Sequence, residues 1–232
     1  MTDFAAPKEK KEMKEITLAD VETAVKTIAG TALKNEQYFC ELDSYAGDAD
    51  FGVSLASGFR AIEQEWQALD HSSIGGLLLK ISMVISKNVG GCSGPIWGTA
   101  FMRAGALSKD RTTITLDDLD KMLTAAIEGI QKRGGAQLGD KTLLDSLIPI
   151  RDLVHEHAAK PDANPSDVLV KATAVANEAI ERTKPWVAKR GRQQFTGDRS
   201  KDTPDPGIVA IATMMNDLCT QFGVAKRAPG KN

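Results

Sequence analysis

The segment TLDDLDKMLTAAIEGI (residues 115–130) shows most clearly how this chain should fold. Thr115 and Asp118 stand at the spacing of a capping box, with Asp in place of the usual Glu, and this pattern predicts the start of a helix. Apolar residues then follow at helical spacing, among them Met122 and Ala126. The segment therefore predicts an amphipathic helix.

Other segments of the chain carry helix signals of the same kind. Residues 17–20 (TLAD) repeat the capping box, and residues 164–165 and 205–206 each place a capping side chain before a proline at the first helical position. Aromatic content is only 5%, which favours helices over strands. Periodic apolar stretches near residues 55–69, 74–89, 95–107 and 142–158 bring the expected number of helices to eight, with a kink at Pro149.

The connections between these helices are short, which favours antiparallel neighbours and predicts an up-and-down bundle or closed helical barrel. Alternate loops then lie at the same end. One end receives the loops at 41–52, 90–94, 134–142 and 190–207, which hold the glycine clusters and nearly all of the unusual acidic spacing. The other end receives the ordinary polar turns at 70–73, 108–112 and 159–164. We therefore expect a functional site at the first end.

Composition excludes several classes of protein. The 232 residues are 42% hydrophobic, enough for one domain over residues 16–224 between disordered polar tails at 1–15 and 225–232. A net charge of −2 argues against nucleic-acid binding. The three cysteines have no CxxC spacing, so neither a disulfide framework nor a zinc site is indicated. Without a signal-like start or an 18-residue apolar run, we expect a cytoplasmic protein that does not enter a membrane.

The first glycine-rich loop carries three carboxylates within eight positions, Asp43, Asp48 and Asp50. Ligands that offer only oxygen suit hard cations such as Mg2+, Mn2+ or Ca2+. An EF-hand is excluded because Phe59 stands where its bidentate Glu belongs. The alternative is that these residues are solvated aspartates and a helix cap.

The second loop, GGCSG (90–94), leads directly into a helix and could present backbone N–H groups to an anion. The simpler interpretation is a capping turn with Ser93 as the cap and Cys92 packed. In the third loop, Asp140 is expected to cap the next helix, and Lys141 either meets a phosphate or is solvated. Arg192, in the unusually long fourth loop, could clamp a phosphate, contact a partner or be solvated.

Four segments together resemble the L subunit, or Dak2 domain, of dihydroxyacetone kinases. They are LDSYAGDADFG (42–52), VGGCSGPIWG (89–98), GDKTLLDSL (139–147) and GRQQFTGDRSKDTPDPG (191–207). They stand in the family's order and span roughly residues 21–222. The resemblance implies an all-α fold, a closed barrel of eight antiparallel helices with a nucleotide bound across the loops at one end.

The resemblance also implies functional residues. Asp43, Asp48 and Asp50 match the family's ligands for two Mg2+ ions. Segments that line the nucleotide, ADP or ATP, match Phe51, Gly52, Val53, Ser54, Cys92, Ser93, Gly134, Leu143, Arg192, Asp205, Pro206 and Gly207. The family pattern has histidine where this chain has Phe51. This departure affects the contact that the residue makes with the phosphate end of the nucleotide.

By the same resemblance, the chain is a kinase subunit that passes a phosphoryl group to a short hydroxyketone. A histidine of a separate K-type subunit holds that substrate, and the metals act electrostatically with no catalytic side chain from this chain. The donor is ATP or a phosphotransferase-system phosphocarrier subunit. A regulatory module that docks on a transcription regulator is the alternative. The sequence leaves open which short hydroxyketone is the substrate (dihydroxyacetone, an erythrulose or another) and whether the chain forms a homodimer.

Overall fold

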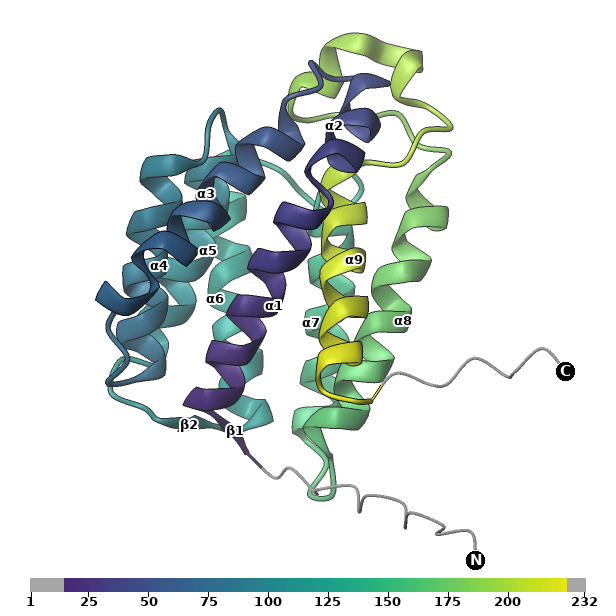
Figure 1. Ribbon diagram of the computed structural model, residues 1–232. Coiled ribbons are helices and arrows are strands. Elements are labelled where there is room, and N and C mark those ends of the chain that lie inside the picture. Colours follow the sequence, from purple (N-terminus) through teal and green to yellow (C-terminus); the bar gives the residue numbers. More distant parts are fainter. Residues whose placement is uncertain (1–14, 225–232) are drawn as a thin grey trace, which may run out of the picture.

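The computed structural model describes residues 15–224, so the tails predicted at 1–15 and 225–232 lie outside the described residues except for Glu15 (Figure 1). The described part contains nine α-helices: α1 (Leu18–Lys34), α2 (Glu36–Ser44), α3 (Phe51–Glu65), α4 (Ile74–Asn88), α5 (Ser93–Leu107), α6 (Leu116–Gly134), α7 (Leu144–Ala158), α8 (Pro165–Thr183) and α9 (Pro206–Gln221). Two 3-10 helices, η1 (Trp66–Ala68) and η2 (Arg192–Ser200), and two strands, β1 (Ile16–Thr17) and β2 (Thr113–Ile114), complete it. None of the described helices is long and apolar enough to cross a membrane.

The helix starts predicted from capping residues are confirmed. Thr17 and Thr115 each accept a bond from the backbone N–H three residues ahead, and the Asp at that position accepts from the N–H of the cap. Asn164 accepts from the N–H of Ser166, and Asp205 accepts from that of Ile208. Local side-chain chemistry therefore sets where these four helices begin.

The first predicted helix is in fact two helices. The chain leaves helical geometry at Asn35, where φ is −105° and ψ is 16°. Both the backbone N–H of Asn35 and its Nδ2 donate to the carbonyl of Thr31. Because α2 then continues to Ser44, it occupies part of the segment predicted to be a loop, and the prediction of eight helices is one short of the nine in residues 15–224.

Strands β1 and β2 form an antiparallel pair in which Ile16 lies opposite Ile114. The sequence predicts an all-α fold, because strands of two residues have no periodicity to detect. The described part of the chain is mostly helical but also contains this short strand pair. The pair joins the segment before α1 to the segment before α6, at the end of the molecule opposite the long loops (Figure 1).

The helices pack in chain order. From α3 to α9 each helix contacts the next one, and α1 contacts both α3 and α9. The main core lies between them and contains buried side chains such as Phe39, Phe59, Ile81 and Val209. In Figure 1 the helices run up and down, so the loops that follow α2, α4, α6 and α8 lie together at the upper end.

Helix α7 continues through Pro149. Proline has no N–H to donate to the carbonyl four residues earlier, which belongs to Asp145. That carbonyl accepts a bond of 2.7 Å from Arg182 Nη2 instead. The missing helical bond is thus replaced by a link between α7 and α8.

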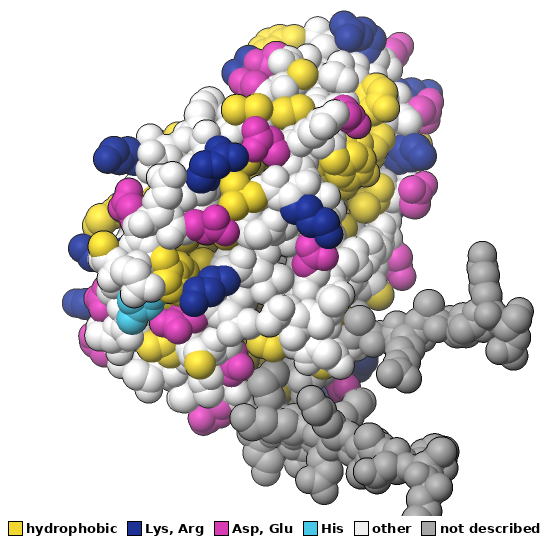
Figure 2. Space-filling view, viewed as in Figure 1, with side chains coloured by type: hydrophobic (Ala, Val, Ile, Leu, Met, Phe, Trp, Pro, Cys, Tyr) yellow, Lys and Arg dark blue, Asp and Glu magenta, His cyan; other side chains and the backbone are white. Residues whose placement is uncertain are grey.

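The surface seen in Figure 2 has acidic and basic side chains interspersed, with apolar groups between them. This mixture agrees with the net charge of −2, because neither sign of charge dominates that face.

Candidate functional site

A cleft of about 510 Å³ opens among the four loops at the upper end of the helices. Each of the four loops predicted to share that end contributes to its walls, so this part of the sequence-based prediction is confirmed. The lining includes the predicted residues Asp43, Asp48, Asp50, Phe51, Ser54, Cys92, Ser93, Gly134, Leu143, Arg192, Asp205, Pro206 and Gly207.

Two predicted residues, Gly52 and Val53, do not line the cleft. Successive residues of a helix face different directions. Gly52 faces α2, where a Cβ atom would overlap the carbonyl of Glu36 and stand 2.9 Å from the backbone nitrogen of Cys40. Val53 is 51% exposed. Gly52 therefore allows α3 to approach α2 closely, which positions the loop between them.

The cleft has an apolar wall that the sequence did not reveal. It is formed by Ile96, Trp97, Ile130, Ala136 and Leu144, together with Leu143. Trp97 is 8% exposed, and its ring lies edge-on to that of Phe59 at a centroid distance of 6.3 Å. It serves both the core and the wall. The position of Ile96 and Trp97 in the first turn after the GGCSGP loop is the signal that could have identified them.

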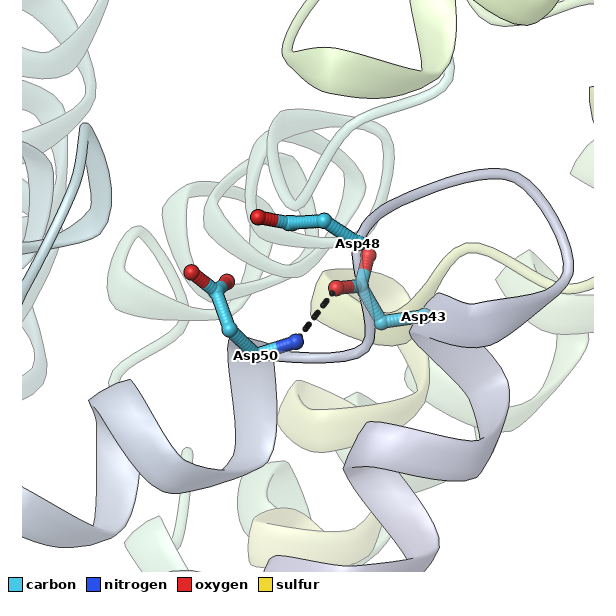
Figure 3. A group of neighbouring side chains, drawn as sticks. All are labelled: Asp43, Asp48 and Asp50. Carbon is cyan, nitrogen blue, oxygen red and sulfur yellow. Dashed lines mark hydrogen bonds between the residues drawn. The ribbon is translucent and has the colours of Figure 1, made fainter.

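The three aspartates converge at the mouth of the cleft (Figure 3). Asp43 lies near the end of α2, Asp48 lies in the loop, and Asp50 immediately precedes α3. One carboxylate oxygen from each lies within 4.8 Å of the other two. Asp43 is 7% exposed, and its Oδ2 accepts from the N–H groups of Asp50 at 3.1 Å and Phe51 at 3.4 Å. Asp43 therefore caps the start of α3 and fixes the backbone at Asp50.

The aspartate cluster concentrates negative charge. Burial raises the pKa of the Asp50 carboxyl, the negative charges of Asp48 and Asp43 raise it further, and the positive charge of Arg192 lowers it. The Arg192 guanidinium bonds to Asp48 through Nη1 and lies 3.4 Å from Asp50 Oδ2 through Nη2. The cluster thus favours a positive group between Asp48 and Asp50.

The second loop turns at Gly91, where φ is 60°. Cys92 is the residue before α5, it forms no side-chain capping bond, and Ser93 is the first helical residue. The prediction that Ser93 caps this helix is therefore wrong by one position. Because no side chain takes up the first N–H groups of α5, they remain able to bind an anion beside the cleft.

The third loop differs from prediction at two residues. Asp140 does not cap α7, because Asp145 accepts from the N–H of Thr142 at 2.8 Å and Asp140 bonds to Arg190 Nε at 3.2 Å. Lys141 is neither solvated nor free to meet a phosphate. It is 1% exposed, and its Nζ bonds to backbone carbonyls.

Asp205 lies partly buried in the cleft wall and caps α9 through a 2.8 Å bond from the N–H of Ile208. Burial raises the pKa of Asp205 to about 7, although the bond from Ile208 and the charge of Lys141 both act to lower it. This carboxyl is therefore able to exchange a proton near neutral pH.

A second hollow of about 640 Å³ lies between α6 and α7, away from the four loops. Its charged groups are largely paired with one another, as in the 2.8 Å contacts of His155 with Asp120 and of Arg151 with Asp152. This hollow lacks a cluster of three possible metal ligands, so we place the functional site in the loop cleft.

Helices packed in up-and-down order, with an acidic cleft in the loops at one end, define a helical domain whose site suits a cation and an anionic ligand. The family model of the DAK2 domain matches residues 45–220. The chain therefore belongs to the DAK2 domain family.

Known proteins resemble this chain over most of its length. "PEP-dependent dihydroxyacetone kinase, ADP-binding subunit DhaL" of Escherichia coli is 32% identical over 182 residues, which cover 78% of this chain and 86% of that protein. "L-erythrulose 1-kinase" of Mycolicibacterium smegmatis is 32% identical over 201 residues, 86% of this chain and 35% of that one. The dihydroxyacetone kinase of C. freundii, solved in complex with AMP-PNP and Mg2+, superposes on this chain with a TM-score of 0.67 at 22% sequence identity. The match covers 95% of this chain and 37% of that one, and it supports the fold.

Proposed function

We propose that this chain is the nucleotide-binding subunit of a dihydroxyacetone-type kinase. It holds ADP or ATP with Mg2+ and passes a phosphoryl group to a short hydroxyketone on a separate K-type subunit. The observation that carries the proposal is the cluster of Asp43, Asp48 and Asp50 at the mouth of a cleft with an apolar wall. The name of the E. coli relative and the ligands of the C. freundii kinase support it.

The aspartate cluster fits the metal. Its ligand atoms are all oxygens, which suits Mg2+, and Arg192 marks the space between Asp48 and Asp50 as one that favours positive charge. We propose that Asp43, Asp48 and Asp50 together hold two ions. When bound, Mg2+ neutralises phosphate charge and stabilises the phosphoryl group during transfer.

The rest of the cleft offers a place for each part of a nucleotide. Ile96, Ile130 and Leu143 form an apolar surface suited to a base, and the glycine turn before α5 presents N–H groups suited to phosphate. The aspartates lie at the mouth, where the terminal phosphates would meet the partner subunit. The contact of α9 with α1 supports a closed helical barrel that keeps the four loops in register.

A separate substrate subunit is proposed because no histidine lines the cleft to hold a hydroxyketone covalently. The three histidines of the chain, His71, His155 and His157, do not line it. The name of the E. coli relative favours a PEP-dependent phosphocarrier as donor, whereas Phe51 in place of histidine favours exchangeable ATP.

Thermal unfolding with magnesium and ADP tests the site. At a ligand concentration of about 100 times Kd, binding adds about 2.7 kcal/mol to the folded state, which corresponds to roughly 5–10 °C in Tm for a domain of this size. Asp48→Ala and Asp50→Ala should each abolish the increase, because each removes a metal ligand.

Asp162→Ala is the matched control, since Asp162 is exposed in the loop between α7 and α8 at the opposite end. It should leave the increase unchanged. An undiminished increase in both Asp48→Ala and Asp50→Ala would contradict the metal assignment, and no increase in the wild-type protein would contradict nucleotide binding itself.

A further inference from the structure

Lys141 is one of the largest fully buried side chains in the described part of the protein. Its Nζ donates to the carbonyl oxygens of Lys184 at 3.0 Å, Trp186 at 2.8 Å and Ser200 at 2.5 Å. An ammonium group has three N–H bonds, so all of its donors are used. Lys141 could bind a phosphate only by releasing one of these carbonyls.

The three carbonyls come from both ends of the long segment between α8 and α9. Lys184 and Trp186 precede η2, whereas Ser200 is its last residue. Lys141 therefore joins residues 184–186 to residue 200, which lies 14 positions after Trp186. We call the place where these two stretches meet the base of the segment. Arg192, which reaches Asp48 and Asp50, lies between the two stretches.

Neighbouring contacts hold the same base together. The backbone carbonyl of Asp140 accepts from the N–H of Lys189 at 3.0 Å, and its carboxylate bonds to Arg190 at 3.2 Å. Ser200 Oγ accepts from the N–H of Ala188 at 2.9 Å. These bonds tie one stretch to the third loop and to the other stretch. Within residues 15–224, Lys141 is the residue outside the segment whose hydrogen bonds reach both stretches.

The burial of Lys141 is costly and needs compensation. Desolvation lowers the pKa of its ammonium group, while the carboxylates of Asp205 and Asp202 act to raise it. Its backbone is left-handed, with φ at 61°, which is unfavourable for a residue with a side chain. Buried carbonyls need donors, and three of them converge here. The arrangement is therefore built around this ammonium group.

We propose that Lys141 is a positioning residue that closes the base of the segment between α8 and α9 and thereby holds Arg192 at the mouth of the cleft. It contacts no ligand itself and acts through Arg192. Its effect on nucleotide binding rests on the proposed function, whereas its effect on the segment does not.

Hydrogen exchange of the backbone amides tests the effect on the segment. In Lys141→Met, the amides of residues 187–201 should exchange about tenfold faster than in the wild-type protein, whereas those of α4 and α5 should be unchanged. Lys189→Met is the matched control, because it removes the same charge from an exposed residue of the same segment, and it should leave the exchange unchanged. Wild-type exchange of residues 187–201 in Lys141→Met would overturn the proposal.

A double-variant comparison tests the path through Arg192. Lys141→Met should weaken the binding of magnesium and ADP about tenfold, but should add nothing when Arg192→Met is already present. Additive losses would overturn a role through Arg192. If the wild-type protein does not bind magnesium and ADP at all, the proposed function fails, and hydrogen exchange still decides the role of Lys141.

If Lys141→Met does not fold, the wild-type protein provides the measurement. With ¹⁵N-labelled lysine, one ammonium group should exchange slowly and show nuclear Overhauser contacts to the α protons of Trp186 and Ser200. Rapid exchange of every lysine ammonium group would overturn the proposal.

Discussion

Asp205 should make this protein less stable as the pH rises from acid to neutral. Its carboxyl lies partly buried in the cleft wall, and burial raises its pKa from an ordinary value of 3.8 to about 7. Between those two values the folded protein binds a proton at Asp205 that the unfolded chain has already released. Folding stability contributed by this proton is therefore complete below pH 3.8 and is lost as the pH rises through 7.

The size of the effect follows from the two pKa values. Integrating the difference in bound protons predicts a loss of about 2.5 kcal/mol between roughly pH 5 and pH 8. This figure is an upper value, because the carboxyl faces the cleft and water there lowers the desolvation. A loss of about 1 to 2.5 kcal/mol is expected.

Urea unfolding of the wild-type protein and of Asp205→Asn, at about pH 5 and about pH 8, isolates this contribution. Asparagine keeps an oxygen that can accept a hydrogen bond from Ile208 but carries no charge at either pH. The stability of the variant relative to the wild-type protein should therefore rise by the predicted amount between the two pH values. Asp162→Asn, at an exposed site, should follow the wild-type protein. An equal difference in stability between the wild-type protein and Asp205→Asn at both pH values would rule out a raised pKa for Asp205.

Three further outcomes are expected. Phe51→His should slow ADP release about tenfold, because imidazole can donate a hydrogen bond of about 1.5 kcal/mol or more to a phosphate oxygen and a phenyl ring cannot. Equal release rates, measured by stopped-flow, would show that other groups already supply this contact. The purified chain should not phosphorylate dihydroxyacetone until a K-type subunit is added, and turnover by the chain alone would disprove the division of labour. Thr115→Ala should lower stability by about 1 kcal/mol through loss of the capping box of α6, and an unchanged unfolding midpoint would mean that the cap adds nothing.

Phe51 shows how the structure sharpens a question raised by the sequence. Its ring is 6.2 Å from that of Phe39, and it packs against the main core while also lining the cleft. Part of the side chain is therefore committed to packing. A histidine at this position would lose some of that contact, so the predicted gain in ADP affinity should come with a small loss of stability.

The sequence by itself determined four of the helix starts and the end of the molecule at which the four long loops meet. A capping box such as that at Thr115 depends on residues three positions apart, and the alternation of loops depends only on short connections. The aspartate cluster could be predicted for a similar reason, because Asp43, Asp48 and Asp50 belong to one loop and its borders.

Only the tertiary structure decided features that depend on distant parts of the chain. Lys141 looked like a phosphate ligand or a solvated lysine until three carbonyls, 43 to 59 positions away, were found around its ammonium group. Gly52 matched the nucleotide-lining pattern, yet it faces α2 because that helix passes too close for a side chain. A sequence pattern records which chemistry a residue offers, but burial and the direction of a side chain arise from packing, which sums contacts over the whole fold.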